Sequence, residues 1–416
     1  MKFILTPVGS AGDVHPFLGI GSVLRGRGHD VTVVTSEPFR AAAEKLDLAF
    51  RGAWTDEAFD RVIRDPDLWH ARRGLKVILD VAGALLPDMH EAIAEVYESG
   101  AVLVGHSISF ATRVFEEKHH AKGMTVHLSP NVFRSQHAQP VFGPGIDMSD
   151  WPRWVKRALW WFADRWMIDP KIAPALNRWR AGLGLGPVQR VFRDWIHSPH
   201  GLIGLFPDWF GAPQPDWPGH LQMTGFPLFD REEEQETGRA LSQWLEHRPI
   251  VFMPGSANVQ AEAFFSAAAG AVERLGCRAL FMTPWREQCP KALPDGVLHV
   301  AYAPFDKVLP SCAAVVHHGG IGSCAQGMAA GIPQLIMPMS FDQPDNAARL
   351  KRLGVGEGLY PAKFTAERVA QVLDRLVSDD RVADRCRILR DRIVGADALS
   401  LTCDAIERSG ETEPND

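Results

Sequence analysis

The sequence lacks the cysteine patterns of disulfide-stabilised and zinc-binding proteins. Its six cysteines all fall in the last third of the chain, and no two of them form a CxxC pair. Secreted disulfide-rich proteins pair cysteines throughout the chain, and structural zinc sites cluster them. We therefore expect reduced thiols and a cytoplasmic protein.

The sequence also lacks long apolar runs and runs of basic residues. No apolar stretch is long enough to span a bilayer, and the short run near Met1 predicts a first strand instead of a signal peptide. The 44 Lys and Arg residues against 50 Asp and Glu residues give a net charge of −6, which argues against a nucleic-acid partner. The apolar fraction of 46% is typical of a globular protein.

What the sequence contains is an alternation of short strands and helices in both halves. Apolar runs at residues 3–6 and 31–35 flank a glycine loop and a helix expected over residues 17–27. The second half repeats this order, with strands expected at residues 249–253, 279–282, 297–300, 313–316 and 334–337. Strand–helix–strand units imply parallel sheets. The sequence therefore predicts an α/β protein with two Rossmann-like domains.

Changes in composition suggest the domain limits. We expect an N-terminal domain over residues 1–225, a charged linker over 226–240, a C-terminal domain over 241–395, and a C-terminal helix and polar tail over 396–416.

The end of the N-terminal domain is rich in tryptophan. Nine of the 13 tryptophans lie between Trp151 and Trp217, which predicts a helical insertion over about residues 150–217. Trp151, Trp154 and Trp161 recur at helical spacing, which favours an aromatic stripe packed on the core. The alternatives are a lining for an apolar ligand or a surface that rests on a membrane, because Trp together with Lys or Arg suits an interface.

The most informative segment follows the strand expected at residues 313–316. It reads HHGGIGS over residues 317–323 and leads into a helix of small residues. Glycines let the backbone approach a ligand closely, and a helix N-terminus presents unpaired N–H groups with a partial positive charge. The pattern predicts a diphosphate-binding loop in which His318 donates a hydrogen bond to a phosphate.

A second polar pair follows the strand expected at residues 334–337. Asp342 and Gln343 come at its carboxyl end, where open α/β sheets bind ligands. Neighbouring carboxylate and amide groups can bind sugar hydroxyls. A solvated turn with a helix cap has the same pattern.

These residues resemble the nucleotide-sugar signature of inverting family 1 glycosyltransferases. HHGG with the downstream DQ is similar to the sterol glucosyltransferases and to the glycopeptide and macrolide antibiotic glycosyltransferases. The N-terminal GSAGDVHPFLGIG, TGFP at residues 224–227 and MPGSAN at residues 253–258 also fit. The resemblance covers both halves and is lost only in the Trp-rich region. It implies the GT-B fold, in which an acceptor domain and a donor domain face each other across a cleft.

The resemblance assigns donor-binding roles residue by residue. His318 matches the histidine on the donor diphosphate, Asp342 and Gln343 match the pair that binds the donor sugar, and Ser256 matches a hydroxyl near the phosphates. The backbone cradle corresponds to Gly319, Gly320, Gly322 and Ser323. Tyr302 and Phe305 flank the nucleobase, where many relatives have Trp and Gln. Gln326 stands where a glutamate often binds the ribose, so the chain departs from the family at these three positions.

Asp13 is the predicted catalytic base. Inverting transfer needs a group that takes the proton of the acceptor hydroxyl, and Asp13 matches the position where relatives carry Asp or His. An Asp in this setting is also a common helix N-cap. His15 is the rival, because an ordinary histidine pKa of about 6.5 suits a general base. His106 and His127, each near a strand end, are expected at the acceptor site.

The sequence therefore predicts an inverting hexosyltransferase that moves a sugar from a UDP- or TDP-sugar to a hydroxyl of an apolar small molecule or lipid. No metal and no other cofactor are expected, because a helix dipole and a histidine can replace the cation of DxD-containing transferases. Peripheral membrane contact is a further expectation. The alternatives are a sugar-nucleotide epimerase or hydrolase of the same fold, and a non-catalytic nucleotide-sugar-binding protein.

Overall fold

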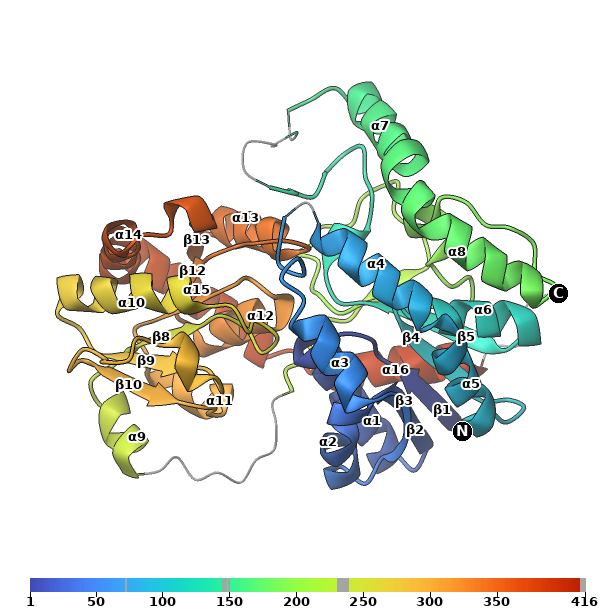
Figure 1. Ribbon diagram of the computed structural model, residues 1–416, viewed down its shortest axis with the longest axis horizontal. Coiled ribbons are helices and arrows are strands. Elements are labelled where there is room, and N and C mark those ends of the chain that lie inside the picture. The colour runs from blue at the N-terminus through green and yellow to red at the C-terminus, as the bar shows by residue number, and fades with distance from the viewer. Residues whose placement is uncertain (72, 144–147, 149, 230–238, 412–416) are drawn as a thin grey trace.

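Short apolar runs form two sheets in which every described strand pairing is parallel (Figure 1). The computed structural model describes residues 1–71, 73–143, 148, 150–229 and 239–411. The seven-stranded sheet has the order β3-β2-β1-β4-β5-β6-β7, and the six-stranded sheet has the order β10-β9-β8-β11-β12-β13. The predicted α/β architecture with two Rossmann-like sheets is confirmed.

The strands of the first sheet are β1 (Lys2–Thr6), β2 (Asp30–Ser36), β3 (Ala49–Trp54), β4 (Val102–His106), β5 (Lys122–His127), β6 (Leu202–Gly204) and β7 (Leu221–Met223). Those of the second sheet are β8 (Ile250–Met253), β9 (Ala279–Met282), β10 (Val297–Val300), β11 (Ala314–His317), β12 (Gln334–Ile336) and β13 (Gly356–Gly358). In each sheet the strand order reverses between two central strands, β1 and β4 in the first and β8 and β11 in the second. Ligands of open α/β sheets bind beyond the carboxyl ends of such strands.

Helices connect the strands of both domains. The first domain contains α1 (Ala11–Gly26), α2 (Arg40–Lys45), α3 (Asp56–Ile63), α4 (Gly74–Ala84), α5 (Leu86–Val96), α6 (Phe110–His119), α7 (Arg153–Phe162), the π-helix η3 (Ala163–Ile168) and α8 (Asp169–Gly182). The second contains α9 (Arg239–Leu245), α10 (Glu262–Leu275), α11 (Phe305–Val308), α12 (Ile321–Ala330), α13 (Gln343–Leu353), α14 (Ala366–Ser378) and α15 (Asp380–Val394), followed by α16 (Ala398–Glu411). Short helical segments lie at η1 (Glu37–Phe39), η2 (Pro130–Val132), η4 (Val191–Trp195), η5 (Arg286–Gln288), η6 (Leu309–Ser311) and η7 (Pro361–Lys363).

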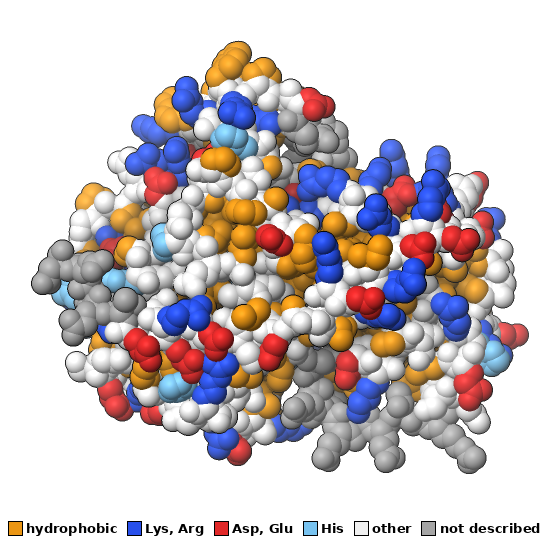
Figure 2. Space-filling view, turned by 180° about the vertical axis from the view of Figure 1, so that it is seen from behind, with side chains coloured by type: hydrophobic (Ala, Val, Ile, Leu, Met, Phe, Trp, Pro, Cys, Tyr) orange, Lys and Arg blue, Asp and Glu red, His pale blue; other side chains and the backbone are white. Residues whose placement is uncertain are grey.

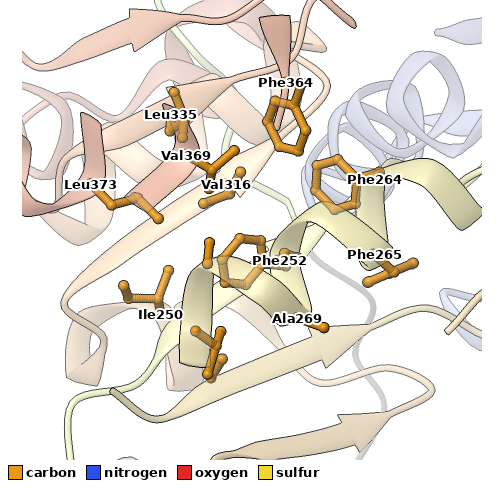
Figure 3. Packing of buried hydrophobic residues seen from close by; sticks show 14 of the residues in the cluster. Ile250, Phe252, Phe264, Phe265, Ala269, Val316, Leu335, Phe364, Val369 and Leu373 are labelled. Atoms are coloured by element: carbon orange, nitrogen blue, oxygen red, sulfur yellow. The ribbon is translucent and has the colours of Figure 1, made fainter. Parts of the chain in front are cut away.

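The core of the second domain is built from apolar side chains of the sheet and of α10 and α14 (Figure 3). Phe264 on α10 stacks on Phe364 at a ring distance of 5.2 Å, and Phe252 on β8 meets Phe281 on β9 at 5.5 Å. Aromatic pairs at these distances add to the stabilisation from burial. This packing holds β8 and its neighbours rigidly, and so fixes the loops that follow their carboxyl ends.

Helix α16 returns from the second domain to pack on the first. Cys403 and Ile406 are buried among the apolar residues of the first sheet and α1. Thr402 Oγ1 donates to Thr224 Oγ1 at 2.7 Å and so joins α16 to the residue that follows β7 of the first sheet. The predicted linker over residues 226–240 lies largely outside the described residues, as does the end of the predicted tail, residues 412–416.

An apolar cluster joins the two domains. Phe206 and Phe210 from the first domain pack in one cluster with Met328 and Leu350 from α12 and α13. Arg349 Nη1 also donates to the carbonyl of Phe210 at 2.7 Å. These contacts position α12 and α13 against the first domain.

The Trp-rich region contradicts the favoured sequence interpretation. Trp154 is 68% exposed and Trp161 is 60% exposed, so these tryptophans do not form a stripe packed on the core. Instead the helix α7 and the π-helix η3 turn their polar residues Lys156 and Asp164 inward, where both are buried. Helical spacing alone does not indicate which face of a helix is covered, and here the polar face is covered.

Candidate active site

Four predicted site residues follow the central strands at which the two strand orders reverse. Asp13 comes after β1 and His106 ends β4, while Ser256 comes after β8 and His318 comes after β11. Because parallel strands end at one edge, each sheet brings its own pair of residues together. The segment of the first domain that carries Trp69 contacts the loops that follow β8 and β11 of the second sheet.

The N-terminus of α1 positions Asp13. Helix α1 begins at Ala11, six residues before the predicted start, and Asp13 lies in its first turn and not in a loop. The backbone N–H of Ser10 donates to Asp13 Oδ2 at 2.7 Å as part of a capping box, and the Ser10 hydroxyl donates to the same oxygen at 3.1 Å. Gly9 has a φ of +136°, and a Cβ there would lie 2.2 Å from Asp13 Oδ2, so the carboxylate needs a glycine at this position.

Asp13 and His15 point to different sides of α1, since residues two apart on a helix are separated by about 200°. Asp13 Oδ1 lies 3.9 Å from His106 Nε2. His15 instead meets the ring of Phe39 at 6.4 Å, in an edge-on arrangement. Of the two candidate bases, Asp13 is therefore the one that faces His106 at the end of β4.

The two histidines expected at the acceptor site have different surroundings. His106 is buried against Phe17, its Nδ1 has no partner among the described residues, and burial lowers its pKa although the charge of Asp13 raises it. His127 is fully buried. Its Nδ1 lies 2.7 Å from Ser107 Oγ and its Nε2 lies 2.9 Å from His197 Nδ1. These internal contacts leave no ring nitrogen of His127 for an acceptor, so the expectation that it binds one finds no support.

The glycines around His318 make room for its ring. A Cβ on Gly255 would lie 2.8 Å from the ring, and a Cβ on Gly320 would lie 2.5 Å from His318 Nε2. His318 Nδ1 has no partner among the described residues. Burial lowers the pKa of His318 to about 3, with a smaller effect from His317, so the ring is neutral near pH 7 and carries one N–H. A neutral imidazole can donate that proton in a hydrogen bond to a phosphate oxygen.

His317 holds the glycine loop, a role that the sequence analysis did not assign. Its Nδ1 accepts from the N–H of Gly319 at 3.0 Å, so its Nε2 carries the proton and donates to Gln334 Oε1 at 2.9 Å. Gln334 Nε2 in turn donates to the carbonyl of Cys324 on α12 at 3.1 Å. This chain fixes the loop and the helix that follows it. Of the two histidines in HHGG, His317 therefore positions the glycine loop, whereas Nδ1 of His318 has no partner among the described residues.

The N-terminus of α12 is open to a ligand. Its N-cap is Gly320, and no described side chain accepts a hydrogen bond from the first N–H groups of the helix. A Cβ on Gly322 would meet no described atom within 4 Å, whereas a Cβ on Gly319 would lie 2.6 Å from Ile336. Gly319 therefore serves the packing, and Gly322 and Ser323 lie where free N–H groups and the helix dipole favour an anion.

Asp342 is the N-cap residue of α13, which agrees with the helix-cap alternative, and Gln343 is buried in the first turn of this helix. The pKa of Asp342 is raised to about 7, mainly by burial and in smaller part by the charge of Asp13, while a hydrogen bond from Asn346 Nδ2 at 2.7 Å opposes the shift. Gln343 Oε1 accepts from the N–H groups of Met339 and Ser340, so this oxygen shapes the local backbone. Asp342 is therefore the ionisable member of this pair, whereas the amide oxygen of Gln343 is bonded to the local backbone.

Trp69, which the sequence analysis left unassigned, connects the two sheet edges. It belongs to the segment between α3 and α4 of the first domain, and its indole N–H donates to the carbonyl of Ala257 after β8 at 3.3 Å. Its ring meets His318 at 6.2 Å and Phe341 at 5.8 Å. Phe341 has a φ of +60°, a conformation that is costly for a bulky residue and that clusters at functional sites.

The remaining donor-side residues lie on the same domain as His318. Ser256 is exposed in the turn after β8, which pairs with β11. Tyr302 and Phe305 are half-buried at the start of α11, and Gln326 is half-buried on α12. The structure thus gathers these residues around β8, β11 and α12.

The first domain has an apolar cavity of about 300 Å³ between α4, α6 and α8. Leu79, Phe110 and Leu176 line it, with Asp80 and Lys171 among its polar residues. Phe110 follows His106 by four residues, so the cavity begins close to the end of β4. Among the described residues no group of three or more His, Cys, Asp or Glu side chains is arranged to hold a metal, and no helix there is long and apolar enough to cross a membrane.

Comparisons with known proteins match both halves of the chain. Residues 3–137 match the glycosyltransferase family 28 N-terminal domain, and residues 283–397 match the erythromycin biosynthesis protein CIII-like C-terminal domain. An O-mycaminosyltylonolide 6-deoxyallosyltransferase from Streptomyces fradiae is 29% identical, over 99% of this chain and 98% of the relative. The chain is a glycosyltransferase of the GT-B fold.

Solved structures of glycosyltransferases have the same fold. The kitacinnamycin glycotransferase is 20% identical and superposes with a TM-score of 0.75, over 98% of each chain. A spinosyn rhamnosyltransferase complexed with thymidine diphosphate is 18% identical and superposes with a TM-score of 0.67, over 97% of this chain and 99% of the other. The sequence-based recognition of the fold and of the enzyme class is confirmed. This glycosyltransferase takes its sugar from a nucleotide sugar.

Proposed function

We propose that this glycosyltransferase moves a sugar, with inversion, from a thymidine or uridine diphosphate sugar to a hydroxyl of an apolar small molecule, with Asp13 as the base. The observation that carries the proposal is the packing of Ile321, the first residue of α12, on the apolar cluster of the first domain that includes Val14 and Phe17 of α1. The helix whose first turn carries Asp13 therefore lies against the helix whose N-terminus follows His318.

Each part of an inverting displacement has a candidate group at this junction. The α12 N-terminus and His318 bind the diphosphate and stabilise the charge of the leaving group. Asp342 binds hydroxyls of the sugar. Asp13 accepts the proton of the acceptor hydroxyl as its oxygen attacks the anomeric carbon from the face opposite the diphosphate. His106, 3.9 Å from Asp13 Oδ1, orients the carboxylate.

The preference for an apolar acceptor rests on the cavity of the first domain. Its volume of about 300 Å³ and its lining by Leu79, Phe110 and Leu176 suit part of an apolar aglycone. The relative from Streptomyces fradiae is named for transfer to a mycaminosylated tylonolide, a bulky molecule of this kind. A complex of a structural neighbour with thymidine diphosphate favours thymidine over uridine in the donor.

The proposal includes transfer without a metal ion. The helix dipole of α12 and the N–H of His318 supply the electrostatic stabilisation that a divalent cation would otherwise give to the diphosphate. Transfer should therefore continue in EDTA at an undiminished rate. A requirement for added Mg²⁺ or Mn²⁺ would contradict this part of the mechanism.

The test compares Asp13→Asn with the wild type in transfer from TDP-glucose to a panel of macrolide aglycones and sterols. We expect kcat to fall by about 100- to 10,000-fold, since a general base contributes that much. The dissociation constant of TDP should stay unchanged, and an α-linked donor should give a β-linked product. Asp380→Asn, which removes an exposed acid from the first turn of α15, is the matched control and should leave kcat unchanged.

Two results would overturn the proposal. If Asp13→Asn transfers sugar at the wild-type rate, another group is the base. If the wild type releases TDP and free sugar whether or not an acceptor is present, the enzyme is a hydrolase of the same fold.

A further inference from the structure

Helix α7 and the π-helix η3 form a continuous helical segment with α8, at one extremity of the first domain (Figure 1). Trp154, Trp161 and Trp166 on this segment are 68%, 60% and 59% exposed. Eight of the 14 large hydrophobic residues that are exposed in the described chain lie on this segment or in the stretch before it: Phe142, Trp151, Trp154, Leu159, Trp161, Phe162, Trp166 and Met167. We call these eight residues the aromatic face. Exposed apolar patches of this kind mark interaction sites.

The inward side of the same segment is polar. Lys156 is 2% exposed and its Nζ donates to the carbonyl of His137, while Asp164 is 4% exposed and forms an ion pair with Arg134. The guanidinium of Arg134 also lies 4.7 Å from the ring centre of Trp160. A helix in water buries its apolar side and exposes its polar side. This segment has the reverse orientation and is held in it by the buried ion pair of Asp164 and the hydrogen bond of Lys156, so its outer side suits an apolar environment.

The exposed charged residues of the helical segment itself are all basic. The exposed charged residues between residues 151 and 168 are Arg153, Arg157 and Arg165, and none of the acidic residues in this range is exposed. The adjoining acids are Asp150, which is exposed, and Asp169, whose carboxylate accepts from the N–H groups of Arg190 and Val191. Figure 2 shows hydrophobic side chains at the tip of the molecule, with Lys and Arg side chains around them and an acidic side chain on one side. This local excess of positive charge contrasts with the net charge of −6 of the whole chain.

We propose that the aromatic face docks on the surface of an anionic phospholipid bilayer. Tryptophan suits the boundary between headgroups and acyl chains because its ring is apolar and its N–H is polar. Arginines beside it attract anionic headgroups. The segment lies in the interface and does not span the bilayer.

A second copy of the chain is a less suitable partner for this face. A two-fold dimer brings the same patch of both copies together. It would therefore place Arg153, Arg157 and Arg165 of one copy against the same three residues of the other, with no exposed acid between residues 151 and 168 to compensate them. Like charges brought together in this way oppose association.

Docking would also bring the bilayer next to the apolar cavity. Helix α8 continues directly from η3, and Lys171, Ile172 and Leu176 on its first turns line that cavity. An acceptor dissolved in the bilayer would then enter the first domain close to the membrane surface. This last step rests on the proposed function, whereas the docking itself does not.

The test is co-sedimentation of the full chain with vesicles, measured without any sugar donor or acceptor. We expect binding to phosphatidylcholine vesicles that contain phosphatidylglycerol, weaker binding to pure phosphatidylcholine, and loss of binding at high salt. Replacing the three arginines by Gln should weaken binding by about fivefold each, on the order of 100-fold in total. The matched control replaces three exposed arginines elsewhere, Arg274, Arg368 and Arg387, and should leave binding unchanged.

A second variant tests the apolar contribution. Trp154→Ser with Trp161→Ser should bind at least tenfold more weakly while its thermal unfolding stays that of the wild type, because both side chains are exposed. Failure of the wild type to bind anionic vesicles would overturn the proposal. So would a wild-type dimer in light scattering that the double variant converts to a monomer, since a second copy would then cover the face.

Discussion

Gly322 provides a direct test of the open N-terminus of α12. The residue has a helical backbone, and a Cβ there would meet no described atom within 4 Å. In the free protein, Gly322→Ala should therefore be tolerated and should raise the free energy of unfolding by up to about 1 kcal/mol, because alanine costs less backbone entropy than glycine in a helix. The same substitution should weaken the binding of a diphosphate at this helix end, because the new methyl group would lie where the anion approaches the N–H groups.

The expected loss of affinity follows from the hydrogen bond that the methyl group would displace. A hydrogen bond to a charged group is worth about 1.5–3 kcal/mol, which corresponds to an increase of about 10- to 150-fold in the dissociation constant of TDP. Isothermal titration calorimetry would measure the binding, and urea unfolding would measure the stability. Gly182→Ala is the matched control, because Gly182 ends α8 and its Cβ would also meet no described atom within 4 Å. The reasoning is refuted if Gly322→Ala binds TDP as tightly as the wild type does.

Three further predictions concern the groups around this helix end. Because the pKa of Asp342 is raised from 3.8 to about 7, the folded protein retains a proton that the unfolded chain loses. The free energy of unfolding should therefore fall as the pH rises from about 4 to about 7. Urea unfolding of Asp342→Asn should not show this part of the fall. His318→Ala should raise the dissociation constant of TDP by at least about tenfold in calorimetry, since it removes a hydrogen bond to a charged group. Trp69, whose ring lies 6.2 Å from that of His318, should report TDP binding by a change in tryptophan emission, and Trp69→Phe should abolish most of that change.

The sequence predicted the sheets well because buried parallel strands are short apolar runs between glycine-rich turns. The strands expected at residues 279–282 and 297–300 have those bounds in the structure. The start of α1 was predicted six residues too late, after Pro16. Proline lacks the N–H that would bond to Gly12, but the capping box of Ser10 and Asp13 starts the helix earlier.

The local structure around the predicted donor site could be anticipated because its residues lie in one contiguous motif. His318 and Gly322 are close in sequence as well as in space, and glycine loops before helices have a known electrostatic use. The contribution of Trp69 could not be predicted, because it depends on how one domain is placed against the other. The orientation of α7 was missed for a similar reason. Its periodicity was visible, but the ion pair of Arg134 with Asp164, 30 residues apart, decides which side faces inward.

The central claim is that the α12 N-terminus and His318 bind a nucleoside diphosphate without a metal ion. Calorimetric titration of TDP, UDP and GDP into the protein in EDTA tests this claim most directly. The account predicts that TDP or UDP binds in EDTA, with the same dissociation constant after Mg²⁺ is added. Binding that appears only with Mg²⁺, or no binding of any of the three nucleotides, would contradict it.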